Sequence, residues 1–465
     1  MKECIIFGAG SFGRKGYYKL HDYFHILAYT DNNSDVWGTS INGINVIAPS
    51  DIPQNENIAV IICSTYYQEI RNQLGTIGIK NIWYINPQNF LLQKCDEDVY
   101  DIYDIKKKLR KVLFVQVAQC IRTYRSAKIL SEQGIEVDFA FLDKHPLLDE
   151  AFTDLPYGKI IPINSLKEFL EFVNKSDYDI IHCSNEPDYL TALLIQFSNK
   201  KIIHDTHDMV SLKRECSMDE LVNEYVANVK ADGNLYVTDK YANIAANKFG
   251  VNLDKIMVIP NLPLKEFLFA NKIEKRSLAD GEIHCVYEGS ITREDKKSHR
   301  FLEPIFLKIA ENQIHVHIYL PVTCNFLVKE GYMEKLEQTN PYIHFEGCLE
   351  PKRLISELTQ YDIGLAMYNV TERNKAHLAN ASATKFYDYL AAGLPIVVAD
   401  IDTHRKFVEE NCVGKVIDLQ GNILKQLEDV LSIKISDNIL EEKKMYCDLY
   451  ADALIEFYEK ILNNK

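Results

Sequence analysis

The sequence predicts an α/β protein whose domains are built on parallel sheets. Short β-branched runs such as IAVIIC, YDIIHC and LPIVVA recur along the chain, and each is separated from the next by enough residues for a helix. This alternation is typical of parallel strands joined by crossover helices. The length of 465 residues corresponds to roughly three domains of ordinary size.

Three blocks follow from the positions of the strands and of the polar stretches between them. Residues 1–95 form the first block, which ends after the strand IWYI, and the charged residues 96–110 are expected to be a linker. The second block covers 111–265 and the third covers 282–437. The tail 438–465 carries apolar residues at helical spacing, so we expect a closing helix there.

Charge and hydropathy exclude several classes of protein. The net charge of -14 argues against a nucleic-acid binder. No apolar run approaches the roughly 18 residues that a membrane span needs, and MKECIIFGAG reads as a strand and a turn rather than a signal peptide. We therefore expect a cytoplasmic protein. A solvated linker face is the plainer interpretation of the basic run Lys106–Lys108 with Arg110, and contact with an anionic surface at the inner membrane face is the alternative.

The eleven cysteines are scattered and form no CxxC pair. Many stand inside apolar runs such as VIICS and HCVYEG, which is typical of buried, reduced thiols. Because paired ligand spacing is absent, the sequence predicts no metal site.

A glycine motif opens the first block. Gly8, Gly10 and Gly13 stand between the strand CIIF and an expected helix, and Asp31 follows the next strand, HILAYT. This spacing matches the dinucleotide fingerprint, in which a phosphate approaches the helix N-terminus and an acidic residue holds a ribose. The motif therefore raises NAD as a cofactor and a nucleotide-sugar epimerase or dehydrogenase as a function.

The first block is too short for that function by itself. It holds only half of a dinucleotide fold, and no substrate domain with a catalytic Tyr-x-x-x-Lys couple follows it. The phrases GAGSFGRKGYYKL and AVIICSTYYQEIRNQL resemble small Rossmann-like domains attached to polysaccharide-biosynthesis enzymes. That resemblance implies an accessory role, with nucleotide binding as the alternative.

The third block contains a segment suited to binding a diphosphate, ASATKFYDYLAAGLPIVVAD. Ser382 or Thr384 is placed to cap a helix that starts near Lys385. The helix N-terminus and the lysine charge favour phosphate oxygens there. Asp388 lies one turn deeper on the same face, where a carboxylate accepts both hydroxyls of a ribose. The plainer interpretation is a surface Lys385–Asp388 pair.

This segment resembles the donor-binding segment of retaining GT-B glycosyltransferases similar to glycosyltransferase family 4. The resemblance extends more loosely from Lys111 to the end. It implies that 111–265 is the N-terminal, acceptor lobe and 282–437 the C-terminal, donor lobe, giving three Rossmann-like domains in all. Many relatives carry two Glu residues eight positions apart. Asp388 matches the second, but the first is Asn380 here, which leaves the sugar open.

The resemblance also implies a phosphate-binding turn in YEGSITREDKK. Gly289 and Ser290 match the small residues of the turn. Arg293, Lys296 and Lys297 are alternative candidates for the downstream base that contacts the donor phosphates. A solvated loop carries the same residue types.

Two further segments match the resemblance. Cys348 and Leu349 would offer backbone groups to the nucleobase. Arg122 and Arg125 open the first helix of the second block, where many relatives have a glycine-rich loop. This departure suggests an anionic acceptor.

The stretch HDTHD at 204–208 ends a strand of the second block. In the resembling family a His-Asp or His-Glu pair stands here, at the mouth of the cleft between the lobes. His207 would hydrogen-bond the transferred sugar or the acceptor in its neutral form. A structural histidine and a metal-binding pair are the alternatives, but GT-B enzymes generally hold the diphosphate without a metal.

Together these features predict a glycosyltransferase with His207 and Lys385 as its catalytic residues and no required cofactor. It would move a sugar from a nucleotide-diphosphate donor to a glycan or lipid-linked acceptor in cell-surface polysaccharide synthesis. The resemblance alone implies retention of configuration. The alternatives are an NAD-dependent epimerase or dehydrogenase and a non-catalytic GT-B scaffold.

Overall fold

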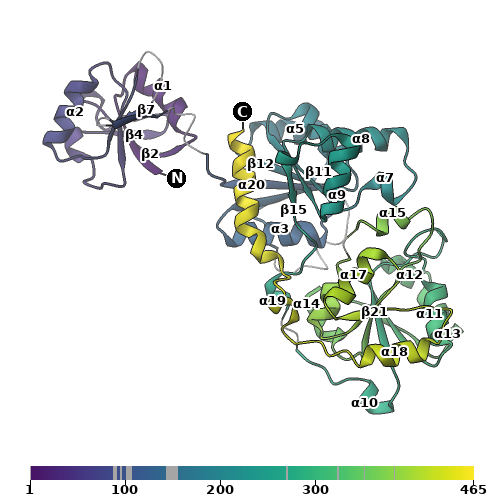
Figure 1. Cartoon of the computed structure of the whole chain (residues 1–465). Coiled ribbons are helices and arrows are strands. Elements are labelled where there is room, and N and C mark those ends of the chain that lie inside the picture. Colours follow the sequence, from purple (N-terminus) through teal and green to yellow (C-terminus); the bar gives the residue numbers. More distant parts are fainter. Residues whose placement is uncertain are drawn as a thin grey trace. The chain divides into compact units, whose positions relative to one another are not determined.

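The computed structural model divides into two compact units, residues 1–109 with 462–465, and residues 110–461 (Figure 1). The first unit reaches Leu109, beyond the expected block boundary at residue 95. All three sheets are dominated by parallel strands, which confirms the predicted α/β fold. The structure describes residues 2–86, 92–94, 97–100, 107–142, 155–268, 271–321, 324–349, 351–381 and 383–464.

The first unit is an eight-stranded sheet of order β3-β4-β2-β1-β5-β6-β7-β8. The central strands β4, β2, β1, β5 and β6 pair in parallel, and the strands at both edges pair antiparallel. The elements are β1 (Lys2–Phe7), α1 (Ser11–Leu20), β2 (Phe24–Thr30), β3 (Ser40–Ile41), β4 (Ile44–Ile47), β5 (Ala59–Ile62), α2 (Tyr67–Thr76), β6 (Ile82–Ile85), β7 (Leu92–Lys94) and β8 (Glu97–Tyr100).

The second unit begins with a seven-stranded parallel sheet of order β11-β10-β9-β12-β13-β14-β15, here called the first lobe. Its strands are β9 (Lys111–Gln116), β10 (Glu136–Leu142), β11 (Ile160–Ile163), β12 (Ile180–Ser184), β13 (Lys201–Thr206), β14 (Gly233–Tyr236) and β15 (Ile256–Val258). Its helices are α3 (Ile121–Glu132), α5 (Leu166–Lys175), α6 (Tyr189–Phe197), α7 (Val210–Lys213), α8 (Met218–Lys230) and α9 (Asp239–Ile244).

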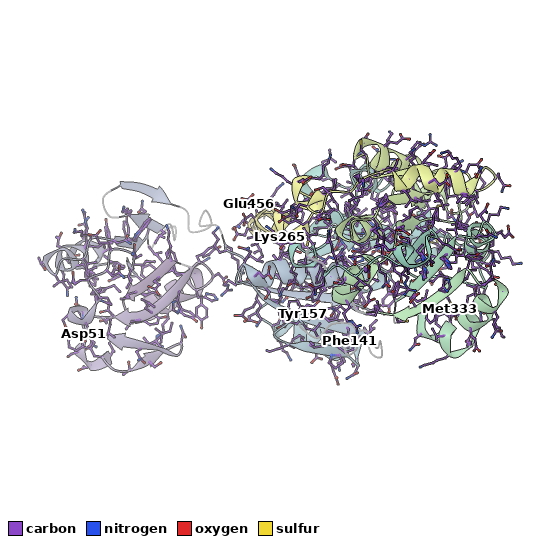
Figure 2. The ribbon with its side chains drawn as sticks, turned by 90° about the horizontal axis from the view of Figure 1, so that it is seen from below. Asp51, Phe141, Tyr157, Lys265, Met333 and Glu456 are labelled. Atoms are coloured by element: carbon purple, nitrogen blue, oxygen red, sulfur yellow. The ribbon has the colours of Figure 1, made fainter. Side chains whose placement is uncertain are left out.

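Aromatic packing supports one side of this sheet. Phe139 of β10 stacks on Tyr157 with a centroid distance of 5.1 Å and on Phe141 with 6.2 Å. Figure 2 labels Phe141 and Tyr157, which lie close together in this lobe. Stacked rings bury a large apolar area and fix the segment around Tyr157 against the strand.

The second lobe is a six-stranded parallel sheet of order β18-β17-β16-β19-β20-β21. Its strands are β16 (His284–Glu288), β17 (His315–Leu320), β18 (Ile343–Cys348), β19 (Ile363–Ala366), β20 (Ile396–Val398) and β21 (Gly414–Val416). Its helices are α10 (Ser277–Asp280), α11 (Glu303–Ala310), α12 (Asn325–Lys329), α13 (Tyr332–Thr339), α14 (Pro351–Leu358), α15 (Lys375–Leu378), α16 (Lys385–Ala391), α17 (Asp402–Glu410) and α18 (Ile423–Leu431).

The tail is not the single closing helix expected over 438–465. It forms α19 (Ile439–Glu442) and α20 (Ala451–Asn463). Lys444 between them has φ +55°, a left-handed conformation that ends a helix, so the apolar spacing continues across a break. The second helix packs on the first lobe, where Tyr458 shares a hydrogen bond with His182 of β12.

No helix of the described part is long and apolar enough to cross a membrane. Of the basic run proposed to touch a membrane, Lys106 lies outside the described residues. The backbone N–H of Lys107 donates to Asn463 Oδ1 at 2.7 Å. Arg110 pairs with the buried Asp179 at 3.5 Å. Contact with a membrane remains a prediction.

Candidate active site

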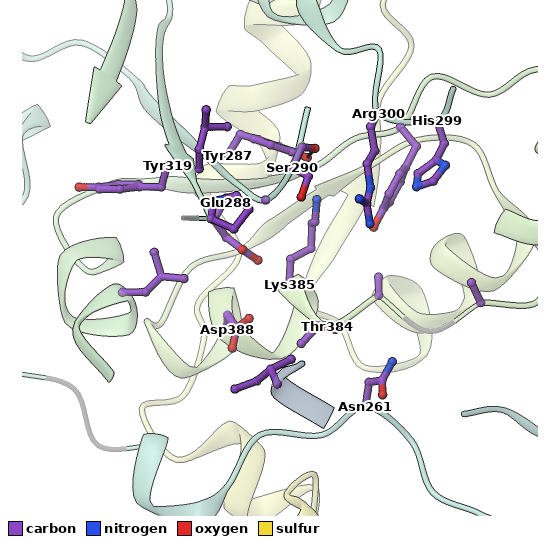
Figure 3. Close-up of a pocket in the computed structure, with 18 of the residues that line it drawn as sticks. Asn261, Tyr287, Glu288, Ser290, His299, Arg300, Tyr319, Thr384, Lys385 and Asp388 are labelled. Atoms are coloured by element: carbon purple, nitrogen blue, oxygen red, sulfur yellow. Dashed lines mark hydrogen bonds between the residues drawn. The ribbon is translucent and has the colours of Figure 1, made fainter. Parts of the chain in front are cut away.

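A pocket of about 440 Å³ lies in the second unit, lined by residues of both lobes. Figure 3 shows Glu288, Lys385 and Asp388 of the second lobe around the same space, together with Asn261 of the first lobe. Arg125 and His207 line it from the first lobe. Such a crevice at the carboxyl ends of parallel strands is where α/β proteins bind ligands.

A turn at the end of β16 forms one wall. Gly289 has φ +130°, which L side chains rarely adopt. A Cβ on this residue would lie 3.2 Å from Tyr287 Oη and 3.3 Å from Lys385 Nζ. Glycine therefore permits both the turn and the close approach of the lysine.

Lys385 is the first residue of α16 and is buried. Its ammonium lies 4.2 Å from the ring centroid of Tyr287 and 5.0 Å from that of Tyr368. Burial and the nearby charge of Arg300 lower the pKa of Lys385 to about 8, against the opposing charges of Glu288 and Asp388. The group is therefore mostly cationic at neutral pH and held by aromatic faces.

Two carboxyl groups share the pocket with this lysine. Burial and the neighbouring Asp388 raise the pKa of Glu288 to about 7. Burial also raises the pKa of Asp388, against the opposing charges of Arg125 and Lys385. Like charges that lie close together in a buried site resist joint ionisation. A cationic or hydroxyl-bearing ligand would relieve that repulsion.

Arg125 enters the pocket from α3 and is only 6% exposed. Its Nη1 donates to the carbonyl of Asn261 at 3.4 Å. Its Nε is a buried donor with no hydrogen-bond partner among the described residues. A buried, incompletely paired guanidinium is costly, so Arg125 is a strong candidate to contact an anionic ligand.

His207 stands at the pocket between a thiol and a carboxylate. Its Nδ1 lies 3.6 Å from Cys120 Sγ, and its Nε2 lies 3.4 Å from Asp205 Oδ2. Burial alone would lower the pKa of His207, but Cys120 and Asp205 raise it to about 10. The expectation of a neutral imidazole is therefore wrong: the two acidic neighbours keep the ring protonated near pH 7.

Of the other residues of the HDTHD stretch, Asp208 lines the pocket beside His207 and pairs with Lys213 at 2.9 Å, whereas Asp205 and His204 are held in the interior. Asp205 is fully buried and accepts from Arg122 Nε and Nη2, each at 2.9 Å. His204 is also fully buried, 3.2 Å from Thr191 Oγ1. The guanidinium of Arg122 occupies Asp205 and the ammonium of Lys213 occupies Asp208, which argues against a metal ion on this stretch.

Asn380, which replaces the first acidic residue of the family pattern, joins the two lobes. Its carbonyl accepts from Thr238 Oγ1 at 2.7 Å, and its side-chain amide donates to the carbonyl of Ala376 at 2.5 Å. A second link runs from Tyr241 Oη to His377 Nδ1 at 2.9 Å. The pocket's acidic partner for Asp388 is Glu288 instead.

The pocket collects most, but not all, of the predicted site residues. Those that line it are His207, Gly289, Ser290, Leu349, Thr384, Lys385 and Asp388. Arg293 does not: it pairs with Glu330 at 2.6 Å. Neither Lys297 nor Cys348 is among the lining residues, and Ser382 lies outside the described residues.

Two important lining residues were missed. In the loop that follows Gly289, Arg300 is the basic residue that lines the pocket (Figure 3). Arg293 and Lys297, which stand closer to Gly289 in the sequence, do not line it. Glu288 reads in the sequence as the last residue of a strand, which conceals that its side chain lines the pocket. The only sequence signal for either is its nearness to the Gly289 turn.

The glycine motif of the first unit is explained largely by packing. A Cβ on Gly13 would lie 1.7 Å from the carbonyl oxygen of Gly8, and one on Gly8 would lie 2.6 Å from that of Cys63. Gly10 has open space around it. Asp31 Oδ2 accepts from the N–H of Ala9 at 2.7 Å, so this carboxylate stabilises the glycine turn itself.

Comparisons with known proteins agree with this geometry. Residues 121–262 match the family model described as Glycosyltransferase Family 4. Residues 310–445 match the Glucosyltransferase 3-like C-terminal domain, and residues 1–83 match the model C2185-like, N-terminal. No protein of curated function matches the chain in sequence.

Solved structures share the fold of the second unit. Sucrose-phosphate synthase from Thermosynechococcus elongatus is 14% identical, with a TM-score of 0.55 over 76% of this chain and 99% of that one. A glycosyltransferase from Rickettsia africae is 14% identical, with a TM-score of 0.54 over 77% of this chain and 100% of that one. Anabaena HepE in complex with UDP-glucose is 15% identical, with a TM-score of 0.55 over 74% of this chain and 98% of that one.

The two-lobed fold and the pocket at the strand ends define a GT-B protein. With the family matches on both lobes, the chain is a glycosyltransferase similar to family 4, which confirms the resemblance seen in the sequence.

Proposed function

We propose that this glycosyltransferase binds a nucleoside diphosphate sugar in the pocket and transfers the sugar to a hydroxyl group. One observation carries the proposal: Lys385 and Arg300 line the same pocket as Asp388. Two cations suit the oxygens of a diphosphate, and a carboxylate is the acceptor that a ribose diol requires.

Catalysis would rest mainly on charge. As the glycosidic bond breaks, negative charge develops on the departing diphosphate, and a cation fixed in a dry site stabilises it without reorganising. Lys385 is held in place by two tyrosine rings and remains mostly protonated at pH 7. Retention of configuration is part of the proposal and follows from the family resemblance.

We propose UDP as the first nucleotide to test, because the HepE complex contains UDP-glucose. The nucleobase would lie near Leu349, at the end of β18. No cofactor or metal is part of the proposal. The Lys385–Asp388 arrangement also argues against a non-catalytic scaffold, because a buried lysine and a partly buried aspartate on the pocket are costly unless a ligand pairs with them.

The first lobe would receive the acceptor. His207 and Arg125 present positive charge to the pocket from that side. We therefore propose an acceptor with an anionic group near the hydroxyl that reacts, such as a lipid-linked or acidic glycan of cell-surface polysaccharide synthesis. The protein would act in the cytoplasm, at the inner membrane face.

The first unit would be accessory. Asp31 already accepts a backbone N–H of the glycine turn, and Gly8 and Gly13 have packing roles. The open space around Gly10 is the one observation that favours nucleotide binding there. NAD binding to the purified chain would restore the epimerase or dehydrogenase alternative.

The experiment is a titration of UDP and of other nucleoside diphosphates into the full chain and into Arg300→Met. The matched control is Arg293→Met, a change in the same loop at a residue paired with Glu330. We expect Arg300→Met to weaken binding on the order of tenfold or more, the size of one lost charged hydrogen bond, and the control to bind normally. Equal affinities in all three proteins would contradict the proposed site.

A further inference from the structure

A cluster of imidazoles lies on the second lobe, at the strand ends away from the pocket. His284 opens β16, and His315 opens β17 directly beside it. His317 follows on the same face of β17, and His344 of β18 is its partner in register. The His284 and His315 rings stack with centroids 4.4 Å apart, and the His317 and His344 rings with centroids 4.6 Å apart.

Each of the first three histidines has one ring nitrogen against a carboxylate. His284 Nε2 lies 3.0 Å from Asp280 Oδ2. His315 Nε2 lies 2.7 Å from Glu282 Oε2, and His317 Nδ1 lies 2.7 Å from Glu346 Oε1. An ionised carboxylate only accepts hydrogen bonds, so these outer nitrogens must carry the ring protons.

The inner nitrogens of the three rings are therefore left with lone pairs. His284 Nδ1 and His317 Nε2 lie only 2.8 Å apart. Two lone pairs at that distance repel unless a cation lies between them. One candidate ligand atom from each of His284, His315 and His317 falls within 4.8 Å of the other two, so a modest shift of the rings would bring all three onto one metal ion.

The surroundings match those of bound metals in a second respect. Metal-binding histidines almost always donate their other N–H to a carboxylate or carbonyl, which fixes the ring and its tautomer. Here three rings have three separate carboxylates in that role. The exposed fractions of the His284 and His317 side chains are 5% and 1%, so an additional ring proton would be a buried charge.

We propose that His284, His315 and His317 bind a divalent transition-metal ion, for which Zn²⁺ is best suited. Neutral imidazoles are preferred zinc ligands, and three of them leave a fourth position for water or for His344, whose Nε2 lies 2.7 Å from His315 Nδ1. Zn–N bonds of about 2.0–2.1 Å require the His284 and His317 nitrogens to separate slightly when the ion binds.

The ion would be structural rather than catalytic. His284 and Glu288 stand at opposite ends of β16, which separates them by about 13 Å along the strand. The metal would join β16 to β17, beside the edge strand β18 of the sheet. Sugar transfer therefore does not depend on the site, and the two proposals fail independently.

The test uses the full chain after chelation and dialysis, titrated with Co²⁺ as a visible probe and then with Zn²⁺ in competition. We expect one equivalent of Co²⁺ to give the strong visible bands of a four-coordinate site, and Zn²⁺ to remove them. The variant His315→Gln should lose this binding. His25→Gln, in the first unit and exposed, is the matched control and should retain it.

Variants at the carboxylates keep the test informative if the histidine variant does not fold. Asp280→Asn and Glu282→Gln change partly exposed side chains and should weaken Co²⁺ binding about 10–100-fold. The proposal would be overturned if the wild type bound Co²⁺ no more tightly than His315→Gln does. It would also be overturned if both carboxylate variants bound Co²⁺ with the affinity of the wild type. In that case a proton shared between His284 and His317 accounts for their short contact.

Discussion

The ammonium of Lys385 lies 4.2 Å from the centre of the Tyr287 ring, across the glycine turn that ends β16. This contact fixes a cation at the pocket. A carboxylate partner would neutralise the charge, whereas an aromatic ring does not. The charge therefore remains available for an anionic ligand.

The lowered pKa of Lys385 predicts proton uptake on ligand binding. With a pKa of about 8 in the free protein, the amine is largely uncharged at pH 9, and a bound diphosphate raises that pKa again. UDP affinity should therefore fall as pH rises through 8. Calorimetry at pH 9 in buffers of different ionisation enthalpy should detect proton uptake when UDP binds to the wild type. This proton uptake should disappear in Lys385→Met. Equal uptake in both proteins would contradict this assignment.

Cys120 should be unusually reactive. Burial would raise the pKa of this thiol, but His207 and the hydrogen bonds from Thr123 lower it to about 6. The thiolate forms as pH rises through 6, so iodoacetamide should modify Cys120 rapidly at pH 7. Peptide mapping provides the measurement, with the buried Cys183 as an unreactive control. His207→Gln should move the reactivity to higher pH; an unchanged profile would refute the pairing.

His207→Ala should impair turnover more than donor affinity. The imidazolium faces the pocket from the first lobe, and a hydrogen bond from a charged group contributes about 1.5–3 kcal/mol. We expect kcat to fall roughly ten- to a hundredfold while the dissociation constant for UDP stays nearly constant. Steady-state rates and nucleotide titration on the same preparation decide the question. Normal turnover in a folded variant would make His207 structural.

Arg122→Ala should destabilise the second unit strongly. The guanidinium pairs with the fully buried Asp205, and removing one partner of a buried pair costs about 3–5 kcal/mol. Lys175→Ala removes one member of an exposed pair on α5 and should cost about 0.5 kcal/mol or less. Urea unfolding of both variants provides the comparison. If Arg122→Ala lost no more free energy of unfolding than Lys175→Ala, the burial of Asp205 would not depend on its pairing with Arg122.

Sequence reasoning located the parts of the site that local pattern determines. A glycine after a buried strand and a lysine at the start of a short helix are local features, and Gly289, Lys385 and Asp388 all line the pocket. The predicted strands also appear in parallel sheets, because their apolar runs are long enough to be buried on both faces.

Features that depend on the folded path of the chain could not be predicted from the sequence. The loop after Gly289 brings Arg300 to the pocket while Arg293 turns to Glu330, and both read as solvated bases in the sequence. The charge of His207 depends on Cys120, which belongs to a different strand-to-helix connection. Neighbours across strands, such as His284 and His315, carry no spacing signal at all.

The central claim is that Asp388 holds the ribose of a nucleoside diphosphate, one turn beyond Lys385 on α16. Asp388→Asn keeps the size of the side chain but replaces one acceptor with a donor and removes the charge. The control is Glu372→Gln, at a side chain that is 95% exposed and outside the pocket.

Calorimetric titration of UDP into the wild type, Asp388→Asn and Glu372→Gln is therefore the most direct test. We predict that Asp388→Asn weakens binding roughly ten- to a hundredfold, the loss of one hydrogen bond to a charged group, while the control matches the wild type. Equal affinities in all three proteins would contradict the assignment of the donor site.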